Sequence, residues 1–368
     1  MGDKMNPFLQ PDYTKPISQV FANATLHLMT QSCSLNSICS WQRTDRLSEL
    51  PSWVPDYSLD QSRAATPLVS IDGTENMFSA SGYNIKTNVP SADVATSTKY
   101  DWRQLCTTGL FLDSVTLLSE TASPNLSFTD SEKIWLSTIS SANNFLPTID
   151  KDVKSTLNTV SEVVRNFNIF WDAIDNKPQT EKSAAHELQD SKLTLVPSTS
   201  SHPGATAIYN KIARDKQRNT VLFGQRSYVV DAYIHSLLCG KISAHKRLTK
   251  EKIDSILSFD FRTQLGDMSP QEIQEVKEIC GPFVDGMRRR RLAITKKGYI
   301  GALPEDTNNG DVVCVLFGCS VPVVLRKQEE VEHGYKFVGE CYLHGFMDAE
   351  AIVMHKKGQL KAEDITLC

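Results

Sequence analysis

After Arg291 the chain consists of short apolar runs separated by glycine turns, and this pattern constrains its fold more than any other feature. The turns are Lys297-Gly298, Asn309-Gly310, Gly318 and His333-Gly334. Glycine adopts positive φ angles at little cost, and Asn-Gly is typical of tight hairpins. Runs of this length between such turns predict the strands Leu292–Thr295, Tyr299–Ala302, Asp311–Phe317, Val321–Arg326 and Tyr335–Tyr342. We therefore expect residues 291–368 to form an antiparallel β meander or small barrel.

The chain before this unit shows helical periodicity. Residues 17–31 place Ile17, Val20, Phe21, Ala24 and Leu28 at helical spacing. Four more helices are predicted from apolar stripes and start signals: Ser131–Phe145, Val153–Ile174, Val221–Gly240 and Pro270–Met287. The last begins with a capping box, Ser269-Pro-Gln-Glu272, with proline at its first position.

Other segments predict a different local structure. Residues 47–58 hold two prolines around Trp53 and are expected to be extended and rigid rather than helical. Met77–Tyr83 is predicted as a strand, and residues 101–120 as a strand followed by a helical turn. Residues 175–203 are polar and are expected to form a mobile insertion or lid.

The predicted class is α+β, with a mainly helical body and a C-terminal β unit. The 368-residue length suggests two or three structural units. We divide the chain into a mixed N-terminal segment over residues 1–125, a helical body over 126–290 that contains the insertion near 175–203, and the β unit over 291–368.

Charge and targeting signals exclude several classes of protein. The formal net charge is −4, so the basic excess of a general nucleic-acid binder is missing. The N-terminal residues lack the apolar core of a signal peptide, and no apolar stretch is long enough to span a membrane. The nine cysteines are odd in number and scattered, which fits reduced thiols in the cytoplasm.

Motifs for nucleotide, nicotinamide, hydrolase or zinc-protease chemistry are missing, and we predict no cofactor. Cys314, Cys319, Cys341 and His344 have a spacing that zinc ligands can show. The cysteines lie in apolar strand-like runs, however, where cysteine is an ordinary buried residue, so we predict no metal. The basic run 288–291 is interpreted as a solvated face at a helix end, with an anion site as the alternative.

One strand carries the nearest approach to a chemical constellation. Glu340, Tyr342 and His344 alternate along it and are expected to share a face. The structural interpretation is a polar, half-exposed face on which Glu340 pairs with Arg326. The functional interpretation is a set of groups that bind a small molecule.

Two segments resemble a known family. The first is Leu50-Pro-Ser-Trp-Val-Pro-Asp-Tyr-Ser58, preceded by Pro11-Asp-Tyr13. The second runs from Arg291 through Gly310-Asp311 and Pro322-Val-Val-Leu-Arg326 to Gly339-Glu-Cys-Tyr-Leu-His-Gly-Phe-Met347. In order and spacing they are similar to the region downstream of the trigger domain in fungal heterokaryon-incompatibility (HET) proteins. That domain precedes the Pro-Asp-Tyr segment in the family, and we expect it to be absent from this chain.

The resemblance and the residues leave three hypotheses open. The first is a stand-alone HET-like protein of fungal specialised metabolism, a cofactor-free cyclase or isomerase that folds an apolar unsaturated substrate, for example in an intramolecular Diels–Alder reaction. The second is an incompatibility or immunity recognition module that binds a protein partner, and the third is a non-catalytic remnant. For the first, we expect an apolar cavity between the helical body and the β unit, with Tyr342 or His344 as the catalytic hydrogen-bond donor. Trp53, Tyr57, Glu340 and Arg326 are the expected substrate-binding residues.

Overall fold

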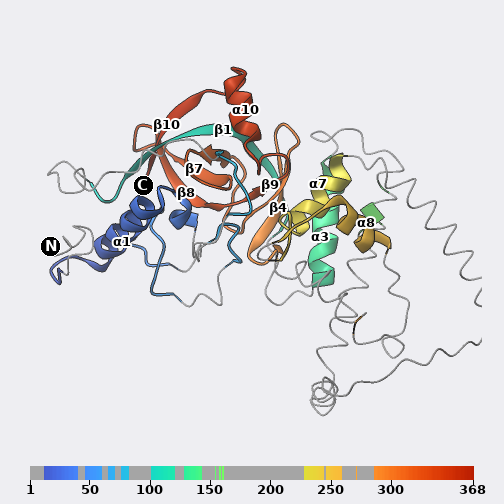
Figure 1. Ribbon diagram of the computed structural model, residues 1–368, viewed down its shortest axis with the longest axis horizontal. Helices are drawn as coiled ribbons and strands as arrows, with labels where there is room; N and C mark the ends of the chain where they lie inside the picture. The colour runs from blue at the N-terminus through green and yellow to red at the C-terminus, as the bar shows by residue number, and fades with distance from the viewer. Residues whose placement is uncertain are drawn as a thin grey trace, which may run out of the picture.

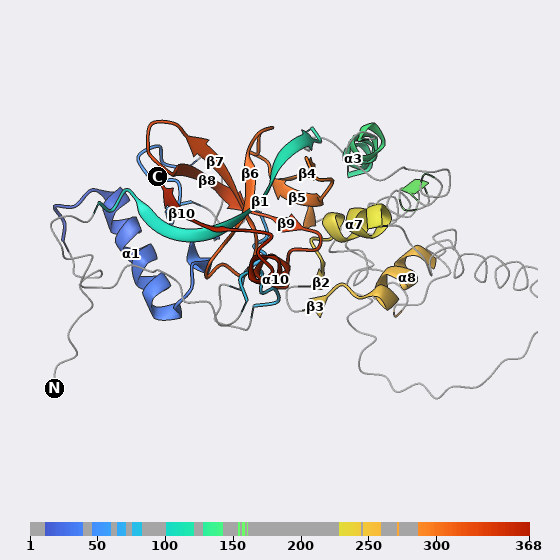
Figure 2. The ribbon, with the colours of Figure 1, turned by 90° about the horizontal axis from the view of Figure 1, so that it is seen from above.

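The computed structural model describes residues 12–39, 46–59, 65–70, 76–82, 101–120, 128–142, 154, 157, 158, 160, 228–243, 246–258, 271 and 286–368. A barrel-like sheet lies at the centre of the described residues (Figure 1). Helix α1 (Ile17–Ser32) lies at one end of this sheet, and α3 (Phe128–Ser141), α7 (Tyr228–Leu237) and α8 (Lys250–Ser258) lie at the other end. Figure 2 shows the same order from above. The described part is therefore mixed α and β with a C-terminal sheet that is largely antiparallel.

Eight strands form the sheet. In sequence order they are β1 (Leu105–Leu118), β4 (Arg290–Thr295), β5 (Ile300–Pro304), β6 (Val312–Leu316), β7 (Val323–Gln328), β8 (Gly334–Glu340), β9 (Tyr342–Leu343) and β10 (Ala362–Leu367). Their spatial order is β10-β8-β7-β6-β1-β4-β5-β9, and β10 also pairs with β1, which closes one ring of strands. A separate pair, β2 (Lys241–Ser243) with β3 (Lys246–Arg247), completes the described strands.

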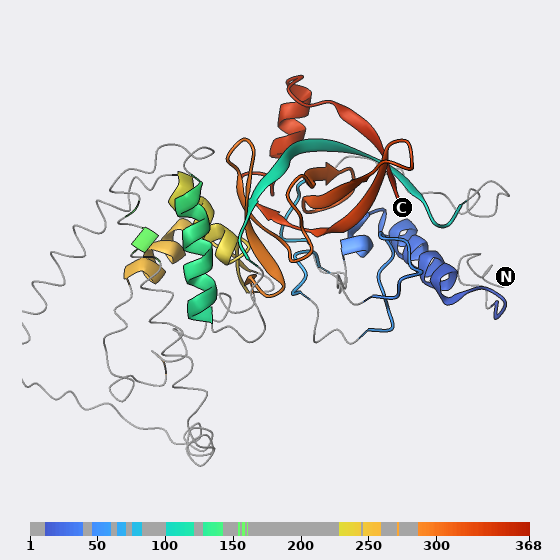
Figure 3. The ribbon, with the colours of Figure 1, turned by 180° about the vertical axis from the view of Figure 1, so that it is seen from behind.

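The predicted strands after residue 290 are confirmed, except that Tyr335–Tyr342 is interrupted at Cys341, and their arrangement as a simple meander is wrong. Strand β5 pairs with β9 rather than with β6, and β1 lies between β4 and β6. Figure 3 shows β1 arching over the barrel. The predicted helical turn at the end of residues 101–120 is also wrong, because β1 continues to Leu118. A strand from far earlier in the sequence thus completes the C-terminal sheet.

Gly109 allows β1 to pair with β10 on one side and with β6 on the other. At this position β1 pairs with Glu363 of β10 and with Leu316 of β6. A Cβ atom here would lie 2.8 Å from Cys314 Sγ and 2.9 Å from the Cδ1 of Ile365, which is too close for carbon. The glycine is therefore required by close packing, since its backbone is not in the left-handed region.

Both faces of the barrel strands are buried. Along β6, Val313 and Val315 belong to one apolar cluster, whereas Cys314 and Leu316 belong to the other. The first of these clusters includes residues of α10 (Glu350–Lys356), and the second includes residues of α1 and α7. Burial on both faces explains why these strands are almost continuously apolar.

Helix α1 forms as predicted, but its stripe does not face the core as a unit. Its buried apolar residues are Ala22, Leu26 and Met29, whereas Ile17, Val20 and Leu28 are among the exposed large apolar residues. The helix holds two apolar stripes, and packing buries only one of them.

Other predictions have mixed outcomes. Helix α3 confirms the predicted helix up to Ser141, and α7 confirms the described part of 221–240. Residues 47–58 contain no helix, as predicted, but they form successive turns rather than an extended segment, and residues 76–82 contain no strand. Nearly all of the predicted helices over 270–287 and 153–174, and all of the polar segment 175–203, lie outside the described residues. In the part of the chain that the structure describes, no helix is long and apolar enough to cross a membrane.

The basic run 288–291 is a solvated face only in part, since Arg288 is exposed but the arginines after it are not. Arg290 and Arg291 begin strand β4, and Arg290 is only 2% exposed. The Arg291 guanidinium donates to the carbonyl oxygens of Ser119 and Thr307, at 2.6 and 3.1 Å. These two cations are therefore part of the packed structure.

Candidate functional site

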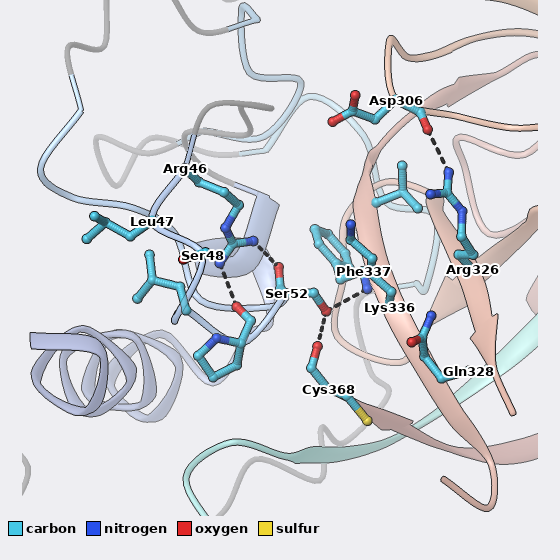
Figure 4. Close-up of a pocket in the computed structure, with 13 residues that line it drawn as sticks. Arg46, Leu47, Ser48, Ser52, Asp306, Arg326, Gln328, Lys336, Phe337 and Cys368 are labelled. Carbon is cyan, nitrogen blue, oxygen red and sulfur yellow. Dashed lines mark hydrogen bonds between the residues drawn. The ribbon is translucent and has the colours of Figure 1, made fainter. Parts of the chain in front are cut away.

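A pocket of about 490 Å³ lies between residues 46–52 and the outer side of strands β7 and β8 (Figure 4). Its lining residues are Arg46, Leu47, Ser48, Leu50, Pro51, Ser52, Asp306, Arg326, Gln328, Lys336, Phe337, Val338 and Cys368. This volume falls within the range of small-molecule sites in proteins. The lining combines three cationic side chains with an apolar wall, so the pocket suits a charged ligand better than a hydrocarbon.

Ser52 fixes the N-terminal wall of the pocket to the barrel. Its backbone N–H donates to the carbonyl oxygen of Cys368 at 2.8 Å, and its hydroxyl group donates to the same oxygen. The hydroxyl also accepts a 2.8 Å bond from the Phe337 N–H on β8. Next to it, Trp53 is fully buried, and its indole N–H donates to the Arg103 carbonyl oxygen at 3.3 Å. These buried polar contacts thus fix the position of one pocket wall relative to the other.

Arg46 shapes the same wall from within. Its Nη1 donates to the Ser52 carbonyl oxygen at 2.7 Å, and its Nη2 donates to the carbonyl oxygens of Pro51 and Val54 at 2.6 and 2.7 Å. Burial lowers the pKa of Arg46, whereas the nearby Asp56 carboxylate raises it. An arginine stays charged despite such a shift. Arg46 therefore brings a fixed positive charge to the pocket.

Arg326 and Lys336 form the opposite wall. Arg326 Nε and Nη2 donate to the two Asp311 carboxylate oxygens at 2.8 and 2.9 Å, and Nη2 also donates to the Asp306 carbonyl oxygen at 2.6 Å. The hydrogen bonds to Asp311 raise the pKa of Arg326. Lys336 is the residue directly opposite Arg326 in the ladder between β7 and β8. Two cationic side chains on neighbouring strands therefore lie beside each other at the pocket.

Of the six residues predicted to form a site, only Arg326 lines this pocket. Trp53 belongs to the core beneath the pocket wall. Tyr57 packs edge-on against Phe21, with ring centroids 5.4 Å apart, and its hydroxyl lies 2.9 Å from Thr25 Oγ1 on α1. Burial raises the pKa of Tyr57. Both aromatic residues fasten the N-terminal segment in place.

Tyr342 and His344 do meet, but in a different part of the molecule. The Tyr342 hydroxyl lies 3.3 Å from His344 Nδ1. The His344 ring packs against His235 of α7, with centroids 5.0 Å apart, and against Tyr228, with centroids 5.5 Å apart. Burial raises the pKa of Tyr342 and lowers that of His344, although Asp231 opposes the latter shift. At neutral pH the pair is therefore an uncharged phenol beside a neutral imidazole.

Glu340 does not pair with Arg326, and its strand face is not half-exposed. It is 4% exposed, and its Oε1 accepts bonds from Arg290 Nη2 at 2.8 Å and from the Leu68 N–H at 2.7 Å. The ladder explains the error, because Glu340 lies opposite Val323, at the other end of β7 from Arg326.

The residues expected to line a shared cavity make separate polar and ring contacts. None of the hydrogen bonds or ring contacts of Trp53 and Tyr57 joins them to Tyr342 or His344. Tyr342 instead packs near Phe78, with ring centroids 6.3 Å apart. Trp53 and Tyr342 nevertheless belong to the same apolar core cluster.

No group of three or more histidine, cysteine or acidic residues among the described residues is arranged to hold a metal ion. Cys314, Cys319 and Cys341 are fully buried, and burial raises the pKa of the Cys314 and Cys341 thiols. The eight cysteines that the structure describes are free thiols. Cys314, Cys319 and Cys341 therefore behave as core residues.

Comparison with known families identifies one part of the chain. Residues 278–360 match the family model of the Het-6 beta-barrel domain. The match covers β4 to β9 and α10, whereas β1 and β10, which complete the sheet, lie outside it. It supports the heterokaryon-incompatibility resemblance for this domain. No curated protein and no solved structure gave a significant match to the chain.

Sequence reasoning missed most of the pocket. Arg46 and Lys336 carry no local motif, Ser52 was noted only as part of the family-like segment 50–58, and the pocket depends on the docking of residues 46–52 against β8. One available signal was the basic pair Arg326 and Lys336 on consecutive strands. Strand pairing places them together only when the register of the hairpin is known.

Proposed function

We propose that this protein is a recognition module of the heterokaryon-incompatibility type that acts through a protein partner, and that the described pocket is its ligand site. The observation that carries the proposal is that one pocket is built by residues 46–52 and by strands of a Het-6 beta-barrel domain. A ligand held there contacts both segments at once. Its presence therefore alters how firmly the N-terminal segment is held, which is a means of signalling to a partner.

The nature of the lining favours recognition over cyclisation at this site. A cyclase for an apolar substrate needs an apolar cavity, whereas this pocket is lined by Arg46, Arg326 and Lys336. Apolar side chains such as Leu50 and Val338 form only part of its wall.

A second candidate function is the cofactor-free cyclase or isomerase, acting at Tyr342 and His344. The hydrogen bond between these two residues favours it, because a positioned phenol can polarise a substrate carbonyl. The test is to incubate the full chain with an unsaturated polyene substrate and compare product ratios with those of Tyr342→Phe and of a protein-free control. Identical ratios in all three samples would exclude it.

The recognition function is tested in fungal cells. The full chain is expressed in pairs of strains that differ in their incompatibility genotype, and viable heterokaryons are counted. Lys336→Glu reverses a charge in the pocket at an exposed residue, so it should leave the fold intact. Lys327→Glu is the matched control, because Lys327 is an exposed lysine of β7 that does not line the pocket.

The wild type and Lys327→Glu are expected to reduce the number of viable heterokaryons in at least one strain pair, whereas Lys336→Glu restores viability. If the wild type has no effect in any pair, or if Lys336→Glu acts like the wild type, the proposed function is wrong.

A further inference from the structure

The facing cations at the pocket have an electrostatic cost. Arg326 and Lys336 lie directly opposite each other in an antiparallel ladder and both line the pocket. Like charges at such positions destabilise a sheet. Asp311 offsets the charge of Arg326, but Lys336 forms no ion pair with any residue that the structure describes. An anion between the two side chains would relieve this repulsion.

The hydrogen-bond donors of these side chains are only partly used. Arg326 donates from Nε and Nη2, and Arg46 donates from Nη1 and Nη2. Among the described residues, the Arg326 Nη1 group has no acceptor, and neither has the Arg46 Nε group. A guanidinium carries five N–H donors, and a lysine ammonium carries three. The pocket walls therefore hold several donors for an acceptor-rich ligand.

The balance of charge indicates what the ligand brings. The lining residues include three cations, Arg46, Arg326 and Lys336, and one carboxylate, Asp306, and because Asp311 already pairs with Arg326, Lys336 supplies the charge without an ion-pair partner among the described residues. A phosphate monoester carries a charge of about −1.5 to −2 at neutral pH and three strong acceptor oxygens. A carboxylate offers one charge and two oxygens, so it satisfies fewer of the available donors.

The size and wall of the pocket indicate that the ligand has an organic body. A volume of about 490 Å³ is much larger than an inorganic phosphate ion requires. Leu50, Pro51 and Val338 also line the pocket and add an apolar part to its wall. This part of the wall can cover a ring or a short carbon chain.

We propose that the pocket binds a small organic phosphate, with its phosphate group between Arg326 and Lys336 and its organic body against the Leu50–Pro51 wall. Arg46 adds a third positive charge at the edge of the site. The assignment names the ligand class of the recognition module and rests on that proposed function.

Binding is measured by calorimetry on the full chain at constant ionic strength. The probes are phenyl phosphate and glucose 6-phosphate, with phenol, glucose, benzoate and inorganic phosphate as matched controls. We expect one or both organic phosphates to bind at least about tenfold more tightly than every control, a difference of about 1.4 kcal/mol. Equal affinity for benzoate, or no binding of either organic phosphate, would overturn the ligand class.

Two variants locate the binding. Lys336→Glu is expected to weaken binding of the organic phosphate by about tenfold or more, whereas Lys327→Glu should stay within about twofold of the wild type. Equal weakening by both variants would mean a non-specific charge effect and would overturn the site.

The two proposals fail in different ways. If no organic phosphate binds but Lys336→Glu still abolishes incompatibility, the ligand class is wrong and the recognition function stands. If an organic phosphate binds at this site but Lys336→Glu leaves incompatibility unchanged, the recognition function is wrong and the binding site stands.

Discussion

Two arginine–carboxylate pairs of the barrel have the same chemistry and opposite surroundings. Arg290 and Glu340 are 2% and 4% exposed, with an N···O distance of 2.8 Å. Arg326 and Asp311 are also 2.8 Å apart, but Arg326 is 29% exposed and lines the pocket. The first pair is closed inside the protein, whereas the second leaves an edge of its guanidinium accessible to a ligand.

The partners of the buried pair show what it does. Arg290 Nη2 donates to the Thr66 carbonyl oxygen at 2.9 Å, and the Leu68 N–H donates to Glu340 at 2.7 Å. Lys241 Nζ adds a 2.9 Å bond to the Pro67 carbonyl oxygen. The pair therefore fastens residues 66–68 to the barrel. The comparison teaches that burial decides whether such a pair holds the chain or presents a charge.

The largest expected effect comes from breaking the buried pair. Arg290→Met leaves the Glu340 carboxylate buried without its cation, which typically costs about 3–5 kcal/mol of unfolding free energy. Urea denaturation of the full chain measures the loss. The double variant Arg290→Met with Glu340→Leu should recover much of it, because no buried charge remains. A single variant as stable as the wild type would contradict the account of this pair.

The same variant has a predicted pH dependence. Burial raises the pKa of Glu340, and Arg290 opposes this rise. When folding raises the pKa of a carboxyl group, the protein becomes less stable as the pH rises. The loss begins near the pKa of the group in the unfolded chain, about 4.3, and is complete above its pKa in the folded protein. Removing Arg290 raises the pKa of Glu340 in the folded protein further, so stability is lost over a wider range of pH.

We therefore expect the unfolding free energy lost in Arg290→Met to be larger at about pH 8 than at about pH 5. The variant Arg290→Met with Glu340→Gln should show the same loss at both values. A loss in Arg290→Met that decreases with pH would contradict this assignment.

An intermediate effect is expected at the pocket pair. Arg326→Gln leaves Asp311, which is 3% exposed, with the Asn308 N–H as a remaining donor. We expect a loss of about 1–3 kcal/mol in unfolding free energy, together with weaker binding of an organic phosphate. Lys327→Gln on the same strand should change neither quantity. If Arg326→Gln lost as much unfolding free energy as Arg290→Met, the proposed difference between the buried pair and the pocket pair would be wrong.

The smallest effect is expected at an exposed pair of the same kind. Arg247 and Asp348 form two bonds of 2.8 and 2.6 Å, but they are 43% and 46% exposed. Solvent and salt weaken such pairs, so Arg247→Gln should cost less than about 1 kcal/mol. Thermal unfolding at low and high salt measures it. A larger loss would indicate that the contact of Arg247 with the Phe78 ring contributes more than expected.

The sequence predicted the local parts of this fold better than their partners. The strands after residue 290 follow from apolar runs and turns, and Gly310 indeed has a φ of 92° in a turn, although the strands on either side of it, β5 and β6, do not pair as a hairpin. The position of β1 between β4 and β6 did not follow, because periodicity contains no information about which distant strand pairs with it.

The site was predictable to a smaller extent. Tyr342 and His344 do contact each other, since they alternate along one segment. The prediction that Glu340 pairs with Arg326 was wrong, because the register of β7 with β8 separates these two residues. Arg46 was missed because its role depends on how residues 46–52 dock, and that is a tertiary property.

Hydrogen exchange on the full chain tests the central claim most directly. The exchange rates of backbone amides are compared with and without the organic phosphate that binds more tightly, and with its neutral parent as control. The account predicts slower exchange in residues 46–52 and 336–338, which form the two pocket walls, and unchanged exchange at residues 342–344. Protection at residues 342–344 with none at the pocket walls would contradict it and would favour the Tyr342–His344 site.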